Sequence, residues 1–454
     1  FLEQKMINEF SINLYEKSCK LEIKAAKDRG RGLFACHEIS KDTVIYKESP
    51  FVVGPPIIGE NRTVCITCSN TIHYLENFCR KCSVEMCSNC SHLLEEECSL
   101  FEKHRNTQKL KSASNWIAIL RVILRTDELS IPWKKLEDHS NNNYRMKFYK
   151  DYIANDLKKV HHEANESEVL KIASILDSNS FRINKHSLRG LFGVSSFINH
   201  DCNPNARVIF DRKGHLHLIS KKTIEKGEEI SISYVAPLLS TRERREKLMS
   251  SKFFYCQCKR CHDPTELGSH LSSLLCPKCQ KGRIVQTNDI LWNCIECGFE
   301  TQDEKVNNLL QFIVKKLENN SSSIDTLDKT IKSFEKKLPQ SHSIMLEYKK
   351  RLIDQQRKSI TLEVIDQKLH ILSQRLDILH ILEGDCDSRL KGFLSYQIYE
   401  LLMGKIYLTS KSSAVQGTDI QKWRLQILKH ITVAKRILSE DNNCPPDLWK
   451  VEVQ

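Results

Sequence analysis

Cysteines in short, regular spacings are the residues of this sequence with the clearest chemistry. Residues 65–98 contain three Cys-x2-Cys pairs and one further cysteine. A tight Cys-x2-Cys turn offers two thiolates to one Zn²⁺, and a structural zinc takes four such ligands in a tetrahedron. Three pairs and an eighth ligand fill two sites, and metal would stabilise a segment too short for its own apolar core. The predicted cysteine ligands are Cys65, Cys68, Cys79, Cys82, Cys87, Cys90 and Cys98.

The eighth ligand has three histidine candidates. His92 closely follows the last pair, His104 lies beyond Cys98, and His73 lies in the loop between two pairs. We assign His92, although a lone histidine is more often a surface or core residue.

Two further cysteine groups predict two more zinc sites, about four in all. Cys256, Cys258 and Cys261 need a fourth ligand, and Cys202 is the only cysteine between Cys98 and Cys256. The last group has ribbon-like spacing and is complete in itself. Its ligands are Cys276, Cys279, Cys294 and Cys297.

Three other stretches combine glycine, polar and aromatic residues. The first is Arg29–Ala35, where Gly30 and Gly32 remove side chains where backbone would lie against a ligand. The second is Phe197–Asn205 and the third is Gly227–Tyr234. Each alone is a weak signal.

Taken in order, and with Cys-x-Cys-x2-Cys following, these stretches resemble the SET domain of protein lysine methyltransferases. The resemblance rests on the Gly-x-Gly turn, the Asn-His-x-Cys-x-Pro-Asn loop and the Glu-Glu-Ile-x-x-x-Tyr strand. The inserted segment 65–98 resembles a MYND zinc finger. Nearly the whole chain is similar to the SET and MYND domain-containing (SMYD) family, and its extra ribbon resembles the arthropod, msta-like branch.

The resemblance implies an α+β multidomain fold and an enzyme. A SET β-fold would be split by a MYND zinc finger and followed by a post-SET zinc site, a four-Cys zinc ribbon and an α-helical TPR-like C-terminal domain. The activity would be S-adenosylmethionine-dependent protein-lysine N-methyl transfer, in line, to histone or non-histone proteins. The implied catalytic residue is Tyr234; the cofactor contacts are Gly30, Arg31, Gly32, Asn179, Asn199, His200 and Phe254; the substrate channel is Phe181, Tyr234 and Tyr255.

Three departures from the family pattern favour an alternative function. Asp201 stands where the family has serine, and Leu94 stands at the position of the MYND histidine. The spacing of Cys87 and Cys90 is also one residue short. The alternative is a catalytically weak or inactive scaffold that recruits partners for transcriptional regulation. A sequence-specific DNA-binding protein is disfavoured, because no two-Cys, two-His finger and no basic recognition helix is present.

The elements that would position these residues follow from periodicity. Strand-like runs occupy 21–23, 43–46 and 51–53 and return over 197–234, where Asp211–Gly214 is a hairpin turn. Residues 103–177 and the chain after 303 have helical patterns. The stripe from Leu362 to Leu379 fits a coiled-coil seam, but Ile371 and Ile378 widen it and favour an array of packed helices.

These patterns divide the chain into seven segments. They are 1–60, the SET N-terminal part; 61–100, the MYND finger; 101–177, a helical SET insert; 178–236, the SET C-terminal core; 237–263, post-SET; 264–302, the four-Cys ribbon; and 303–454, the helical domain.

Bulk composition excludes several classes of protein. Of 454 residues, 40% are hydrophobic and 28% charged, as in soluble globular domains, and no run approaches a membrane span. The chain opens at Phe1 without a charged-then-apolar signal pattern, and its 19 cysteines fit a reducing compartment. The net charge of +12 is spread over helix faces that also carry glutamates. We expect a monomer in cytoplasm and nucleus that binds a protein lysine substrate, and proline-containing peptides through the MYND finger, but no membrane and no specific nucleic acid.

Overall fold

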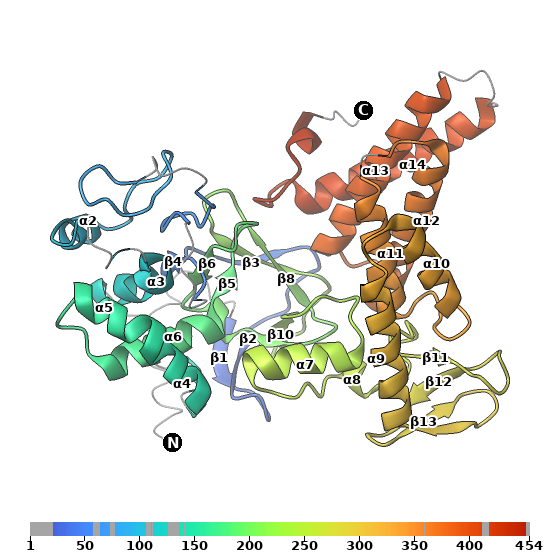
Figure 1. The fold of residues 1–454 in the computed structure, drawn as a ribbon, viewed down its shortest axis with the longest axis horizontal. Helices are drawn as coiled ribbons and strands as arrows, with labels where there is room; N and C mark the ends of the chain where they lie inside the picture. Colours follow the sequence, from blue (N-terminus) through green and yellow to red (C-terminus); the bar gives the residue numbers. More distant parts are fainter. Residues whose placement is uncertain are drawn as a thin grey trace. The chain divides into compact units, whose positions relative to one another are not determined.

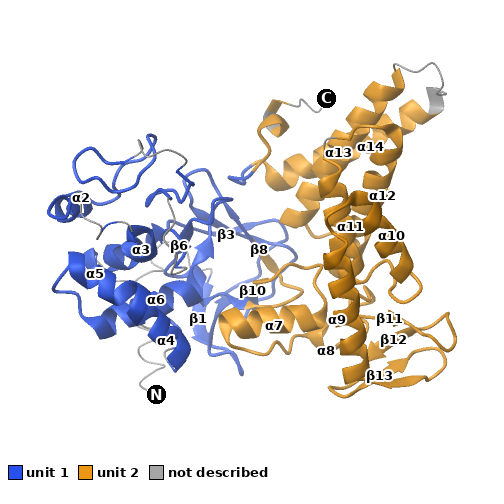
Figure 2. Ribbon diagram, in the orientation of Figure 1, with its two compact units in different colours: residues 1–199, 208–231, 440–443 blue, residues 200–207, 232–439, 444–454 orange. Residues whose placement is uncertain are grey.

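The computed structural model describes residues 21–57, 64–72, 78–105, 110, 112–125, 136–139, 141–357, 359–410 and 417–450. It divides into two compact units, coloured in Figure 2. Unit 1 comprises residues 1–199, 208–231 and 440–443, and unit 2 comprises 200–207, 232–439 and 444–454. Within the described residues, no helix is long and apolar enough to cross a membrane.

Unit 1 holds most of three small sheets, with strand orders β1-β2-β10-β7, β3-β9-β8 and β4-β6-β5. The alternation of buried and exposed residues in β1 is that of a strand with one face in the core. The predicted turn at Asp211–Gly214 joins β8 to β9, and the Gly214 N–H donates to the Asp211 carbonyl. The strands are β1 Leu21–Ala25, β2 Arg31–Ala35, β3 Val44–Glu48, β4 Val52–Gly54, β5 Phe181–Arg182, β6 Arg189–Leu191, β7 Asn199–His200, β8 Ala206–Phe210, β9 Leu216–Ser220 and β10 Glu229–Ile232.

The helices of unit 1 lie together on one side of these sheets (Figure 1). The helix α3 is almost entirely buried, with Trp116 and Ile119 fully enclosed, and it packs against β4 and α6. The helices are α2 Glu95–Glu102, α3 Ala113–Leu124, α4 Asn143–Tyr149, a π-helical turn Lys150–Ala154, α5 Asn155–Val160, α6 Glu166–Asn179 and a 3₁₀ turn Ser195–Phe197.

Unit 2 begins its helical part with α7, Thr241–Lys252. Ser240 and Glu243 form a capping box at its start, and Phe253 ends it in the left-handed conformation with φ 59°. The short helix α8, Lys259–His262, follows. The ribbon strands are β11 Leu274–Leu275, β12 Arg283–Gln286, β13 Leu291–Cys294 and β14 Glu300–Gln302, paired in that order.

A stack of helices completes unit 2, as expected from the C-terminal periodicity. The stripe of α12 packs against both α11 and α13, which is an array rather than a single coiled-coil seam. The helices are α9 Asp303–Asn319, α10 Ile324–Phe334, α11 Ser343–Gln355, α12 Leu362–Glu383, α13 Arg389–Ser410, α14 Gly417–Leu438 and a 3₁₀ turn Pro446–Lys450.

Candidate functional site

The cysteines come together in four groups of four ligands. In each group the ligand atoms all lie within 4.8 Å of one another. Bonds of ~2.3 Å from Zn²⁺ to sulfur give a tetrahedral edge of about 3.8 Å. The Sγ–Sγ separations of 3.7 Å for Cys68–Cys87 and 3.8 Å for Cys79–Cys98 agree with that edge. The groups are Cys65, Cys68, Cys87, Cys90; Cys79, Cys82, His92, Cys98; Cys202, Cys256, Cys258, Cys261; and Cys276, Cys279, Cys294, Cys297.

His92 lies in the second group, at the position assigned to it. Its Nε2 is 3.3 Å from the Cys82 Sγ, and its Nδ1 is 3.4 Å from the Glu97 carboxylate. His104 instead places Nε2 3.2 Å from the carbonyl oxygen of Val160. His73 lies outside the described residues. The four-ligand set is therefore complete although the spacing departs from the family pattern.

Behind His92 lies a buried ion pair that the sequence did not predict. Arg121 donates to both Glu97 oxygens, at 2.6 and 3.1 Å, and the two side chains are 2% and 0% exposed. Arg121 also donates to the carbonyls of Val53 in β4 and Ile66 in the finger. A carboxylate behind a ligating histidine fixes its tautomer and orientation. Glu97 thus orients His92, and Arg121 ties that carboxylate to a SET strand.

The ligand group that contains Cys202 lies beside buried charged side chains. The Cys202 Sγ lies 3.5 Å from that of Cys261 and 3.9 Å from that of Cys256. Arg244 is fully buried and directs its guanidinium at the Cys202 and Cys261 sulfurs, at 3.3 and 3.4 Å. Glu266 accepts a hydrogen bond from Arg244 at 2.7 Å. A buried cation beside four thiolates offsets the negative charge of a zinc-tetrathiolate site.

The two glycines of the Gly-x-Gly turn are needed for different physical reasons. Gly30 has a φ of +70°, which other residues rarely adopt, and it faces open space. A Cβ on Gly32 would lie 2.5 Å from Glu229 Oε1 and 3.0 Å from Asn199 Nδ2. Gly32 therefore makes room for side chains of the protein, and the ligand contact expected of both glycines stays a prediction.

Asn199 joins the predicted cofactor residues of unit 1. Its Nδ2 donates to the Arg31 carbonyl at 3.0 Å and to Glu229 Oε1 at 2.7 Å. The Arg31 guanidinium lies over the Phe197 ring, 5.3 Å from its centroid. Glu229 pairs with Arg29 at 3.5 Å. Hydrogen bonds from the Asn199 side-chain amide thus link the Asn-His loop to the Gly-x-Gly strand and to the Glu-Glu-Ile strand.

The other two predicted residues of unit 1 have local partners. The Asn179 amide donates to the carbonyls of Ile175 and Glu137, at 2.8 and 2.7 Å. The Phe181 ring packs edge-on against Phe192, with centroids 5.7 Å apart. Asn179 thereby closes the end of α6, and Phe181 belongs to an aromatic cluster.

His200 and Tyr234 are neighbours in unit 2. The Tyr234 backbone N–H donates to His200 Nδ1 at 3.0 Å, and His200 Nε2 lies 3.2 Å from the Cys202 Sγ. The His200 ring centroid is 5.3 Å from that of Tyr234 and 5.9 Å from that of Phe254. Both ring nitrogens of His200 thus face groups of the protein, and its cofactor contact stays a prediction.

Lys252, which the sequence analysis did not single out, contacts Tyr234, whereas the predicted channel residue Tyr255 contacts Arg245. The Lys252 ammonium lies over the Tyr234 ring, 5.3 Å from its centroid, so this face accommodates a cation. Tyr255, expected in the substrate channel, is 48% exposed and stacks against Arg245. Asp201 accepts a hydrogen bond from the Asn203 N–H at 2.7 Å, which gives the non-family carboxylate a local structural role.

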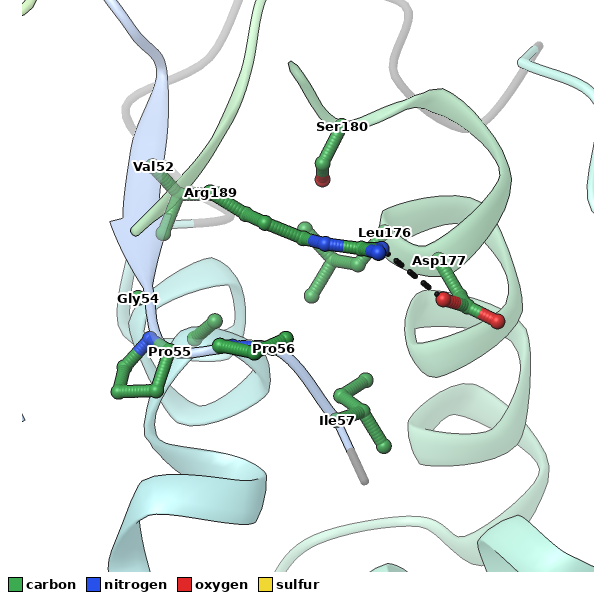
Figure 3. A pocket seen from close by; sticks show the side chains of 10 residues that line it. Val52, Gly54, Pro55, Pro56, Ile57, Leu176, Asp177, Ser180 and Arg189 are labelled. Atoms are coloured by element: carbon green, nitrogen blue, oxygen red, sulfur yellow. Dashed lines mark hydrogen bonds and ion pairs between the residues drawn. The ribbon is translucent and has the colours of Figure 1, made fainter. Parts of the chain in front are cut away.

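A small pocket in unit 1 does not coincide with the predicted site. It has an empty volume of about 300 Å³ and an apolar floor that includes Pro55, Pro56 and Leu176 (Figure 3). Arg189 and Asp177 cross it as an ion pair of 3.0 Å. None of the predicted cofactor or channel residues lines it.

Comparisons with known proteins show what the chain is similar to. The SET domain model matches residues 30–235. SET domain-containing protein SmydA-8, isoform A, of Drosophila melanogaster is 28% identical over 79% of this chain and 84% of its own. A SET and MYND domain-containing protein of Dictyostelium discoideum is 25% identical over 49% of this chain and 78% of its own. The chain is thus similar to SET and MYND domain-containing proteins, and its residues 30–235 match the SET domain.

One of the relatives is named as an enzyme. Histone-lysine N-methyltransferase SMYD3 of Mus musculus is 38% identical over 87 residues, which cover 18% of this chain and 20% of that protein. The multidomain SET fold, the zinc-type clusters and the helical C-terminal region agree with the expectation from sequence.

Proposed function

We propose that this chain transfers a methyl group from S-adenosylmethionine to the side-chain amine of lysine in a protein. The observation that carries the proposal is the arrangement around His200, which fixes the backbone of Tyr234, the family's catalytic tyrosine, at 3.0 Å. The SET match and the methyltransferase relative support it. The departures that favoured a scaffold have local explanations in His92 and Asp201, so no observation favours that alternative.

The residues of each unit suit a cationic cofactor and an amine substrate. Within unit 1, Glu229 offers a carboxylate beside Asn199. Within unit 2, the rings of Tyr234 and Phe254 flank His200 and offer faces that attract cations. When bound, S-adenosylmethionine supplies an electrophilic methyl group on a positively charged sulfonium.

The protein's contribution to the reaction is positioning and control of charge. A free lysine amine has a pKa of about 10.4 and is protonated at neutral pH. Desolvation against aromatic rings disfavours the ammonium and lowers that pKa, which yields the neutral nucleophile. The Tyr234 hydroxyl would accept a hydrogen bond from the amine and orient its lone pair for in-line attack. Most of the acceleration would come from this orientation.

The test measures cofactor binding and methyl transfer separately. Zinc-replete protein is titrated with S-adenosylmethionine by calorimetry and then assayed with radiolabelled cofactor on histones and on a cell-protein extract. We expect Tyr234→Phe to reduce transfer by ~100-fold or more with cofactor affinity unchanged. Asn199→Ala should lose cofactor binding, because it removes the amide that donates to both the Arg31 carbonyl and the Glu229 carboxylate. Tyr152→Phe, at an exposed tyrosine, is the control. Undiminished transfer by Tyr234→Phe would remove that residue from the mechanism, and absent cofactor binding by the zinc-replete protein would favour the scaffold.

Further expectations are part of the same proposal. We propose histone or non-histone proteins as substrates and a monomeric protein in cytoplasm and nucleus. The MYND finger is proposed to bind proline-containing peptides, and a role in transcriptional regulation is proposed without specific nucleic-acid binding. The Drosophila relative supports placement in the arthropod branch.

A further inference from the structure

The imidazole of His200 is 5% exposed and makes two directed contacts within unit 2. One is with the backbone N–H of Tyr234, at 3.0 Å from Nδ1, and the other is with the Cys202 Sγ, at 3.2 Å from Nε2. A backbone N–H only donates, so Nδ1 must be the unprotonated acceptor. The remaining ring proton then belongs to Nε2 and points at the sulfur. A single neutral tautomer satisfies both contacts.

The sulfur that accepts this hydrogen bond is a predicted zinc ligand. Cys202 groups with Cys256, Cys258 and Cys261, and a zinc-bound thiolate is a good hydrogen-bond acceptor. Arg244 Nε also directs its proton to the same sulfur, at 3.3 Å. The position of Cys202 is therefore fixed by metal, arginine and histidine together.

We propose that His200 is a positioning residue: it connects the post-SET zinc site to Tyr234 and thereby restricts the movement of Tyr234. The inference rests on the proposed methyltransferase function and adds a role for the His200 side chain that differs from cofactor binding. The zinc site holds Cys202, the ring holds the Tyr234 backbone at a fixed distance from Cys202, and the Tyr234 hydroxyl is thereby held for the amine. Phe254 packs on the same ring and restricts its rotation.

Two conservative variants separate the two contacts. Glutamine places its amide near the position of Nε2, so His200→Gln keeps a donor for Cys202 and loses the acceptor for the Tyr234 N–H. Asparagine places its amide near Nδ1, so His200→Asn keeps that acceptor and loses the donor to sulfur. His186→Gln, at an exposed histidine of unit 1, is the matched control.

The variants are compared for zinc release to a chelator, cofactor affinity by calorimetry, and kcat and KM for methyl transfer. We expect His200→Gln to lower kcat by ~10-fold or more with KM and zinc retention unchanged. His200→Asn should accelerate zinc release from one of the four sites by ~10-fold and lower kcat less. An equal loss of cofactor affinity in both variants would overturn the proposal, because the ring would then be a cofactor ligand. Full kcat in His200→Gln would also overturn it.

A failure of the proposed function gives a different result. If the wild-type protein transfers no methyl group to any protein, the function is wrong. The zinc-release comparison still tests the link to Cys202, and equal release rates for wild type and His200→Asn would refute it.

Discussion

The ion pair of Glu97 and Arg121 shows how a ligand at an unusual sequence position is held. Two charges that are almost fully buried are costly unless they are paired and all their hydrogen bonds are made. Here the carboxylate binds both Arg121 and His92, while two further guanidinium protons go to carbonyls of β4 and the finger. The pair therefore links a zinc ligand to the SET core.

Glu97→Gln should weaken one zinc site and leave the other three unchanged. The neutral amide no longer orients His92 as a carboxylate does, and Arg121 is left as a buried unpaired cation. We expect zinc affinity at that site to fall by ~10- to 100-fold. Native mass spectrometry during chelator competition counts the retained ions. Glu96→Gln, at an exposed glutamate of the same helix, is the control. Equal retention in the two variants would show that Glu97 does not support the site.

At the scale of elements, the zinc ribbon and the helices after it form one core. Leu274, Ile284 and Trp292 of the ribbon are buried in the same cluster as Ile313 of α9 and Met345 of α11. The Trp292 indole N–H donates to Asp303 at the start of α9, at 2.8 Å. Because the ribbon contributes five of the fifteen buried residues of this cluster, its metal should stabilise the neighbouring helices as well.

Cys279→Ser should therefore destabilise α9, α10 and α11. Loss of one of four thiolates removes most of the zinc affinity of a structural site, and the ribbon folds with its metal. We expect amide hydrogen exchange in these three helices to accelerate by ~10-fold or more. The helices α13 and α14 have a separate cluster that includes Tyr396 and Ile431, and they serve as the internal reference. Acceleration confined to the ribbon would mean that its metal does not support the helices.

At the scale of the whole molecule, sequence predicted what depends on local spacing. Most candidate zinc ligands follow from short cysteine spacings, and the strands and helices follow from periodicity. The division of the ligands in residues 65–98 between two interleaved sites did not follow from spacing. What the sequence did not show depends on tertiary contacts: the partners of the His200 ring, the Arg121 that reaches Glu97 from another helix, and the packing of Phe181 against Phe192. Those contacts join residues that have no regular spacing in the sequence.

The pH dependence of global stability should contain a contribution from His342. This histidine caps α11, where its Nδ1 accepts from the Ile344 N–H at 3.1 Å, and its side chain is buried. Burial lowers the pKa of His342 to about 4, against 6.5 for an exposed histidine, while the Glu266 carboxylate opposes that shift. The folded state thus holds the neutral form, and below pH 6.5 the unfolded state binds more protons, so the free energy of unfolding falls as pH falls toward 4. The contribution lost between pH 7.5 and 5.5 is about 1.4 kcal/mol.

His342→Asn removes this titration and keeps a preferred helix cap, because the Asn oxygen can accept from the same backbone N–H. Urea unfolding at pH 7.5 and 5.5 measures the effect. Acid also weakens the zinc sites, but equally in wild type and variant, so the difference between the two isolates His342. We expect the wild type to lose about 1.4 kcal/mol more than the variant over this interval. His370→Asn, at an exposed histidine of α12, should behave like the wild type. If wild type and His342→Asn lose equal stability, His342 is not held neutral by burial, and acid sensitivity must arise at the metal ligands.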